Sequence, residues 1–221
     1  MELFKYLKSE HFDALSNKGS IRIGTLKNYQ SLEHGTMVSD SMEGSKRFTG
    51  IYDNVTADQI KGSSALSSLI SIGEGGGIGT LKMNNVVIIE PNYFVFSLSN
   101  GYSKSDHDTW LEQESYDACY KLATPNHFFR KVTKQINKIQ PVKFLGLFEV
   151  HYYDEKNGMD FFDPKNSYPA FMLKDYDGFS TQKEIRAVWE PIEKEEIEPI
   201  FIKDIKLRSY VNLHAKVQVG T

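Results

Sequence analysis

Short segments of aromatic and β-branched residues recur along the chain, and they constrain its fold more than any other feature of the sequence. Such segments are typical of β-strands, because their side chains pack well on a pleated surface. The predicted strands are Leu3–Leu7, Ser20–Leu26, Val86–Ile89, Asn92–Ser99, Val142–Tyr153, Ala170–Leu173, Glu184–Trp189 and Lys206–Leu213. They outnumber the predicted helices and do not alternate regularly with them, which favours an α+β fold over a parallel doubly wound sheet.

Three helices are expected between these strands. The first covers Glu10–Ser16 and ends at Gly19, because glycine adopts the left-handed conformation of a helix end without strain. The other two cover Asp106–Ala123 and Asn126–Ile139. Pro125 separates them, because proline interrupts a continuing helix.

The rest of the chain has the character of loops. Residues 27–79 are largely polar, and the glycine-rich run Gly73–Gly79 predicts a hairpin or loop rather than a phosphate-binding turn, because it leads into a strand. The acidic run Glu193–Glu198 predicts a solvated turn. No repeat and no long linker interrupts the chain, so residues 1–221 are predicted to form a single domain.

Composition and the single cysteine indicate the cell compartment in which the protein is expected. Hydrophobic residues make up 40% of the sequence, which is enough to form a core and too much for a disordered chain. No apolar run reaches the ~18 residues that span a bilayer, and the N-terminal segment lacks the apolar stretch of a signal peptide. The single cysteine, Cys119, has no partner for an internal disulfide. We therefore expect a cytoplasmic protein without membrane association.

The late strand contains the first group of candidate site residues. Side chains alternate along a strand, so Gln182, Glu184 and Arg186 are expected on one face. A carboxylate beside a neutral amide suits a catalytic or binding site. The alternative is an edge strand whose two charged residues pair with neighbouring strands or face solvent.

Ser97 and Ser99 form the second group, because they alternate with large apolar residues in an aromatic strand. Serine adds little packing to a strand. The two hydroxyls are therefore candidates to line a pocket, where they would orient a carboxylate or a ligand. The alternative is a strand with one face in solvent.

The N-terminal strands contribute the third group. Lys5 and Arg22 lie on two neighbouring predicted strands, and two cations near one site suit a diphosphate. Tyr6 or Tyr29 would offer an aromatic face to a flat ring. The alternative is that Lys5 and Arg22 are ordinary surface cations and that the tyrosines belong to the core.

One region is strongly basic, although the net charge of −3 excludes a globally basic nucleic-acid binder. Between Ala118 and Phe148 there are six cations and no acidic residue. The candidates for contact with a nucleic-acid backbone are Arg130, Lys131, Lys134 and Lys138. The alternative is the solvated face of an amphipathic helix.

No spacing of cysteine and histidine suggests zinc, and no metal is expected. A metal-dependent nuclease stays open as an alternative, because several oxygen and nitrogen ligands for a hard cation are present. These residues are Asp40, Glu43, Asp106, His107 and Asp108, and their spacing matches no metal motif.

The order of these segments resembles the ADP-ribosyltransferase superfamily. LFKYL, a helix ending in glycine and SIRIGTL resemble its opening, while FSLS and the Q-x-E of Gln182–Glu184 are similar to its arginine–serine–glutamate branch. More narrowly, the outline resembles ADP-ribosyltransferase toxins of bacterial phage-defence toxin–antitoxin systems, one of which modifies messenger RNA. The chain departs from the superfamily in having Lys5-Tyr6 where histidine or arginine is usual, and SLS where STS is usual.

The resemblance implies a split β-sheet core with inserted helices, and NAD as a substrate. In the catalytic roles it implies, Glu184 holds the nicotinamide ribose, Gln182 meets the acceptor and Ser97 orients Glu184. The residues it implies for NAD binding are Lys5, Tyr6, Arg22, Tyr29 and Ser99.

The function expected from the resemblance is an NAD-dependent ADP-ribosyltransferase that modifies a macromolecule, with RNA as one acceptor. Its setting would be phage defence or a toxin–antitoxin system, with an antitoxin or chaperone protein as partner. The alternatives are a catalytically inactive binding module of the same fold and the metal-dependent nuclease.

Overall fold

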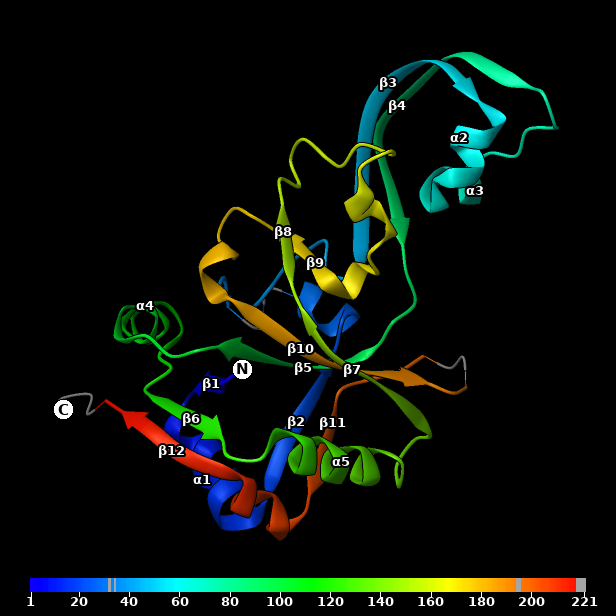
Figure 1. The fold of residues 1–221 in the computed structure, drawn as a ribbon. Coiled ribbons are helices and arrows are strands. Elements are labelled where there is room, and N and C mark those ends of the chain that lie inside the picture. Colours follow the sequence, from blue (N-terminus) through cyan, green and yellow to red (C-terminus); the bar gives the residue numbers. More distant parts are fainter. Residues whose placement is uncertain (32, 34, 194–195, 218–221) are drawn as a thin grey trace.

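A mostly antiparallel sheet of eight strands forms the centre of the computed structural model, which describes residues 1–31, 33, 35–193 and 196–217 (Figure 1). The acidic run Glu193–Glu198 includes two positions, 194 and 195, that lie outside the described residues. The strands of the sheet are β1 (Leu3–Leu7), β2 (Ser20–Thr25), β5 (Phe94–Asn100), β6 (Ala118–Leu122), β7 (Val142–Glu149), β10 (Glu184–Pro191), β11 (Ile200–Lys203) and β12 (Val211–Lys216). They pair in the order β11-β2-β5-β1-β6-β12, and β10 joins β5 to β7.

Strand β5 is the branch point of this sheet. Along one edge it pairs with β10 over six residues, from Phe94 to Ser99. Along the other edge, β2 pairs only with the beginning of β5, at Phe94 and Val95, and β1 pairs only with its end, at Ser99 and Asn100. Strands β1 and β2 therefore diverge between these positions, and the sheet is split there.

Alternation along the strands divides the main sheet into two apolar faces. Leu3 and Leu7 of β1 belong to the larger core, together with α1 (Ser9–Lys18) and α5 (Pro125–Ile136). On the other face, Phe4 and Tyr6 of β1 pack with α4 (Lys104–Glu114). Each fully buried large apolar side chain contributes roughly 1.5–3 kcal/mol, so this packing fixes which residues of β1 face each side.

A second core lies beside the main sheet. Strands β3 (Ser45–Thr56) and β4 (Gly77–Ile89) form a long antiparallel hairpin, with α2 (Ala57–Gly62) and α3 (Ser64–Leu69) between them. Figure 1 shows this hairpin extending away from the main sheet. At its base, the rings of Phe48 and Phe161 stack with centroids 4.4 Å apart. The short parallel strands β8 (His151–Tyr153) and β9 (Leu173–Asp175) pair with each other and lie along the chain between β7 and β10.

The α+β class predicted from the sequence is confirmed, and several element boundaries are wrong. Residues 118–122 form β6 rather than the end of a helix, because this strand is enclosed between β1 and β12. Strands buried on both faces lack the polar alternation that identifies half-buried ones. Of the hairpin β3–β4, the sequence predicts only Val86–Ile89, the end of β4, as a strand, because most of β4 is exposed and its apolar pattern is weak.

Three further expectations need smaller corrections. Ala170–Met172 is a 3₁₀ turn, with strand β9 beginning only at Leu173. Ile205–Tyr210 is also a 3₁₀ helix, so the last strand starts at Val211. Helix α5 ends at Ile136 rather than Ile139. Within the described residues, no helix combines the length and the apolar character needed to cross a membrane.

Candidate functional site

A pocket of about 380 Å³ lies at the split of the sheet. Its walls include Leu7 and Ile21 from the face of the larger core and Phe4 and Trp110 from the opposite face, so the pocket passes between β1 and β2. Among the described lining residues only His11 and Phe201 are exposed, which places the opening beside α1 and β11.

The three groups of candidate residues from distant parts of the sequence meet in this pocket. Its lining residues include the predicted catalytic and NAD-binding positions, which are Lys5, Tyr6, Arg22, Tyr29, Ser97, Ser99, Gln182 and Glu184. Ser99 lies opposite Glu184 in the ladder, and Ser97 lies opposite Arg186. Directly opposed residues in an antiparallel pair project to the same face, so the hydroxyls and the carboxylate share one wall.

Glu184 is buried and held by two cations. Its Oε1 accepts a hydrogen bond from Arg186 Nε at 2.8 Å, and its Oε2 lies 3.1 Å from Lys174 Nζ. Burial alone would raise its pKa, but Arg186 and Lys174, with a hydrogen bond from the Ser97 side chain, hold the pKa well below its usual range. Glu184 is therefore an ionised carboxylate with a fixed orientation.

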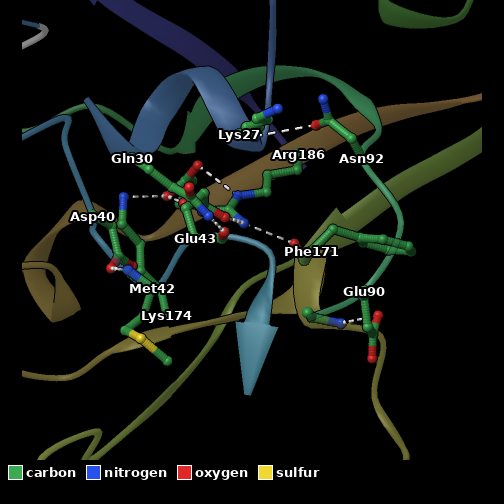
Figure 2. Close-up of polar contacts among 12 residues, drawn as sticks. Lys27, Gln30, Asp40, Met42, Glu43, Glu90, Asn92, Phe171, Lys174 and Arg186 are labelled. Carbon is green, nitrogen blue, oxygen red and sulfur yellow. Dashed lines mark hydrogen bonds and ion pairs between the residues drawn. The ribbon is translucent and has the colours of Figure 1, made fainter. Parts of the chain in front are cut away.

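Arg186 links Glu184 to a second carboxylate, Glu43. The guanidinium donates to Glu43 in bidentate geometry, with NH1–Oε1 at 2.6 Å and NH2–Oε2 at 2.8 Å. It also donates to the Phe171 carbonyl at 2.9 Å, and Figure 2 shows Arg186 between these two partners. The charged residues of β10 thus pair with neighbours, as the structural alternative expected, but they do so inside the protein and not on an edge strand.

Gln182 lines the pocket from a turn and not from the extended strand that the sequence predicts. It belongs to a 3₁₀ turn, Ser180–Gln182, and Lys183 after it has a left-handed backbone (φ 46°), so Gln182 is not part of the extended strand. Its Nε2 donates to the Met37 carbonyl at 2.7 Å, and its Oε1 accepts from Lys174 at 3.2 Å. The amide is buried beside Glu184 nonetheless.

Lys5 and Arg22 line the pocket from the two diverging strands. Lys5 Nζ donates to the Ser97 carbonyl at 2.7 Å and lies 4.8 Å from the centroid of the Phe96 ring. Burial lowers the pKa of Lys5 to about 8, although Glu184 acts in the opposite direction. Arg22 hydrogen-bonds the Asn28 side chain, and its guanidinium lies 6.0 Å from the centre of the Tyr29 ring.

The two candidate tyrosines differ in their surroundings. Tyr29 lines the pocket next to Arg22, and burial raises the pKa of its hydroxyl. Tyr6 also lines the pocket, but its ring is stacked on Trp110 and Tyr102, with centroids 6.1 and 5.9 Å away. Its hydroxyl accepts a hydrogen bond from the Ser103 amide at 3.2 Å. Tyr6 is therefore built into the packing of α4, whereas Tyr29 borders the cavity beside a cation.

The predicted basic surface is separate from the pocket, because none of its four residues lines it. Arg130 and Lys134 are exposed on α5, and Lys138 is exposed just beyond the end of the helix. Lys131 does not join them in solvent, since its Nζ forms an ion pair with Asp204 at 2.9 Å. Of the four cations predicted to contact nucleic acid, Arg130, Lys134 and Lys138 are therefore exposed.

The residues considered for a metal-dependent nuclease do not gather. Glu43 is paired with Arg186, and Asp108 forms an ion pair with Lys104 on α4 at 2.7 Å. Throughout the part of the chain that the structure describes, no three His, Cys, Asp or Glu side chains form a group able to hold a metal ion.

Sequence reasoning missed two of the charged residues around Glu184. Glu43 was considered only as a metal ligand, and Lys174 follows a segment expected to be a strand. The only available signal was their charge, and no local pattern predicts that these side chains are buried, with Glu43 2% and Lys174 5% exposed.

Known proteins give no independent indication of what the pocket binds. Protein-family models, curated proteins and solved structures were each compared with the chain, and none matches it.

Proposed function

We propose that this chain is an NAD-dependent ADP-ribosyltransferase with a split-sheet fold of that superfamily. The observation that carries the proposal is the position of Glu184, a buried and ionised carboxylate opposite Ser99 on one wall of the pocket. It supports the role that the resemblance implies, in which the carboxylate holds the nicotinamide ribose while Ser97 orients it.

The charge of the pocket supports an anionic ligand. Its described lining contains four Lys and Arg residues, which are Lys5, Arg22, Lys174 and Arg186, and two carboxylates, Glu43 and Glu184. The excess of positive charge suits a diphosphate such as that of NAD. Lys5 and Arg22 are closest to the split, so we assign the diphosphate to them and a flat ring to Tyr29.

The reaction breaks the bond between nicotinamide and ribose C1′. Nicotinamide leaves with the bonding electron pair, and the ribose passes through an oxocarbenium-like state, as in glycosidases. The acceptor then attacks C1′ and releases its proton. Glu184 is the group that stabilises the developing positive charge, and a preorganised electrostatic partner of this kind is typically worth about 100- to 1,000-fold in rate. Gln182, buried beside Glu184, is assigned to the acceptor.

RNA is the acceptor that we favour, because Arg130, Lys134 and Lys138 offer exposed cations to a phosphate backbone. A toxin of a toxin–antitoxin or phage-defence system, neutralised by an antitoxin or chaperone, is the setting that the resemblance implies.

One observation favours a second candidate, a binding module that has lost catalysis. Both oxygens of Glu184 accept contacts from Arg186 and Lys174, so a ligand hydroxyl has to compete with two cations. Such a protein would bind NAD or ADP-ribose in the pocket without breaking the glycosidic bond.

The test is transfer of label from NAD to RNA, DNA or a cell lysate, with and without a chelator. Glu184→Gln should abolish transfer that the parent shows, whereas Glu190→Gln, the same change on β10 away from the pocket, should leave it intact. Binding without turnover in the parent would favour the binding module. A folded Glu184→Gln variant that keeps most of the activity would exclude the proposed mechanism, and cleavage that a chelator stops would indicate the nuclease.

A further inference from the structure

The guanidinium of Arg186 has its hydrogen-bonding capacity filled. It has five N–H donors in a rigid planar arrangement. Nε donates to Glu184, NH1 to Glu43 and to the Phe171 carbonyl, and NH2 to Glu43 and, at 3.4 Å, to Glu184. Only 2% of the Arg186 surface is exposed, so water does not replace any of these partners.

The two carboxylates do not share this guanidinium equally. Glu43 receives the bidentate fork, with both contacts at or below 2.8 Å, whereas Glu184 receives one short contact from Nε and one long contact from NH2. Bidentate pairing is the stronger arrangement for arginine and a carboxylate. Glu43 therefore determines which edge of the guanidinium Glu184 meets.

Glu43 itself is held firmly in place. It precedes strand β3, its backbone carbonyl accepts a hydrogen bond from Gln30 Nε2 at 2.7 Å, and its side chain is 2% exposed (Figure 2). If Glu43 lost its charge, the fork of Arg186 would have Glu184 as its nearest anion. NH2 could then shorten its contact with Glu184 Oε2, which is 3.4 Å in the parent, and a tighter pair would reduce the ability of that oxygen to accept ligand hydroxyls.

We infer that Glu43 is a positioning residue, which holds NH1 and NH2 of Arg186 so that the contact from NH2 to Glu184 Oε2 stays long and that oxygen can still accept a hydrogen bond from a ligand in the pocket. Its effect on turnover rests on the proposed function, whereas its effect on the placement of Arg186 and Glu184 does not.

The experiment combines kinetics with structure. Glu43→Gln should lower kcat about 100-fold, the scale expected for a misplaced electrostatic partner, with KM for NAD nearly unchanged. Glu43→Asp keeps the charge and should recover most of that loss. Asp204→Asn, which removes another carboxylate that is paired with a cation and lies outside the pocket, is the matched control and should turn over like the parent.

A crystal structure of Glu43→Gln gives the readout that does not depend on activity. The expected result is a closer pair between Arg186 and Glu184, in which the contact from NH2 to Glu184 Oε2 becomes shorter than the 3.4 Å of the parent. An unmoved Arg186–Glu184 contact, or a kcat equal to that of the parent, would overturn the inference. If the parent neither turns over nor binds NAD, the proposed function fails, and the crystal structure still decides the role of Glu43.

A folding defect is the main complication, because Glu43→Gln removes one of the two carboxylates that balance the buried guanidinium. The double variant Glu43→Gln/Arg186→Gln removes this carboxylate and the guanidinium together, and Arg186→Gln is its reference. Because Glu43 is inferred to act through Arg186, the double variant should have the same kcat as Arg186→Gln alone. A further loss in the double variant would show that Glu43 acts on the site by another route.

Discussion

Glu184 of β10 lies directly opposite Ser99 of β5 in an antiparallel ladder, although 85 positions separate them in the sequence. The same register places Arg186 opposite Ser97. A strand has a side-chain period of two, so all four side chains project to one face of the sheet. The carboxylate, its cationic partner and the two hydroxyls are therefore set by a single pairing between two strands.

The first prediction concerns the serine hydroxyls. Ser97→Ala removes the hydrogen bond that helps keep Glu184 ionised and oriented, so it should lower kcat for NAD turnover about 10-fold, the effect of losing one charge-assisted hydrogen bond of ~1.5 kcal/mol. Ser68→Ala, on α3 and outside the pocket, provides the comparison. Equal rates for the two variants would show that Ser97 has no part in orienting the carboxylate.

The second prediction is a pH dependence of ligand binding. Lys5 has a pKa of about 8 in the free protein, and a bound diphosphate should raise that pKa because it favours the charged ammonium. Binding then takes up a proton above pH 8, so the affinity for ADP-ribose should fall as the pH rises from 7 to 9. Titration calorimetry at several pH values measures this. In Lys5→Arg the cation stays charged, and a decline as steep as that of the parent would assign the effect to another group.

A third prediction addresses the exposed cations of the basic surface. Reversing Lys134 and Lys138 to Glu should weaken RNA binding and lower the slope of log affinity against log salt by about 1.4, since each phosphate contact to a single strand contributes about 0.7. Reversal of Lys61 and Lys82, exposed residues of the β3–β4 region, changes the net charge equally. RNA affinity that responds to both pairs alike would reflect net charge rather than a surface on α5.

The fourth prediction tests the packing of α5 against the sheet. Phe128 is fully buried in the larger core, and Phe128→Ala should lower the free energy of unfolding by about 3–5 kcal/mol. Denaturant unfolding followed by circular dichroism measures the change. Ile139 lies beyond the end of the helix and is 57% exposed, so Ile139→Ala should change stability by less than about 0.5 kcal/mol.

Local patterns predicted the elements that have one clear apolar face. Strand β2 and helix α5 were found this way, and so was the end of α1 at Gly19, which has the expected left-handed backbone (φ 62°). Strand β6 is not predicted because it is buried on both faces, and β4 is predicted only at its end, Val86–Ile89, because it is exposed on most of its length. In both, pairing with distant strands decides the structure, and a local pattern does not report such pairing.

The candidate site was predictable in its chemistry and only partly in its geometry. Glu184, Ser97 and Lys5 were chosen for their residue types in strand-like segments, and the pocket contains all three. The contact of Arg186 with Glu43 was not predictable, because it joins positions 143 residues apart and depends on the path of the chain before β3. Ion pairs of this kind follow from the tertiary fold rather than from spacing in the sequence.

The split at β5 has a consequence for how this protein tolerates change. The seven residues of β5 pair with three other strands, and two of them, Ser97 and Ser99, also line the pocket. The same short segment therefore holds the sheet together and contributes hydroxyls to the site. Insertion of a single residue between Val95 and Ser97 would turn both hydroxyls to the opposite face of the sheet. The length of β5 is consequently fixed, and variation in what the pocket binds has to come from the segments that surround it.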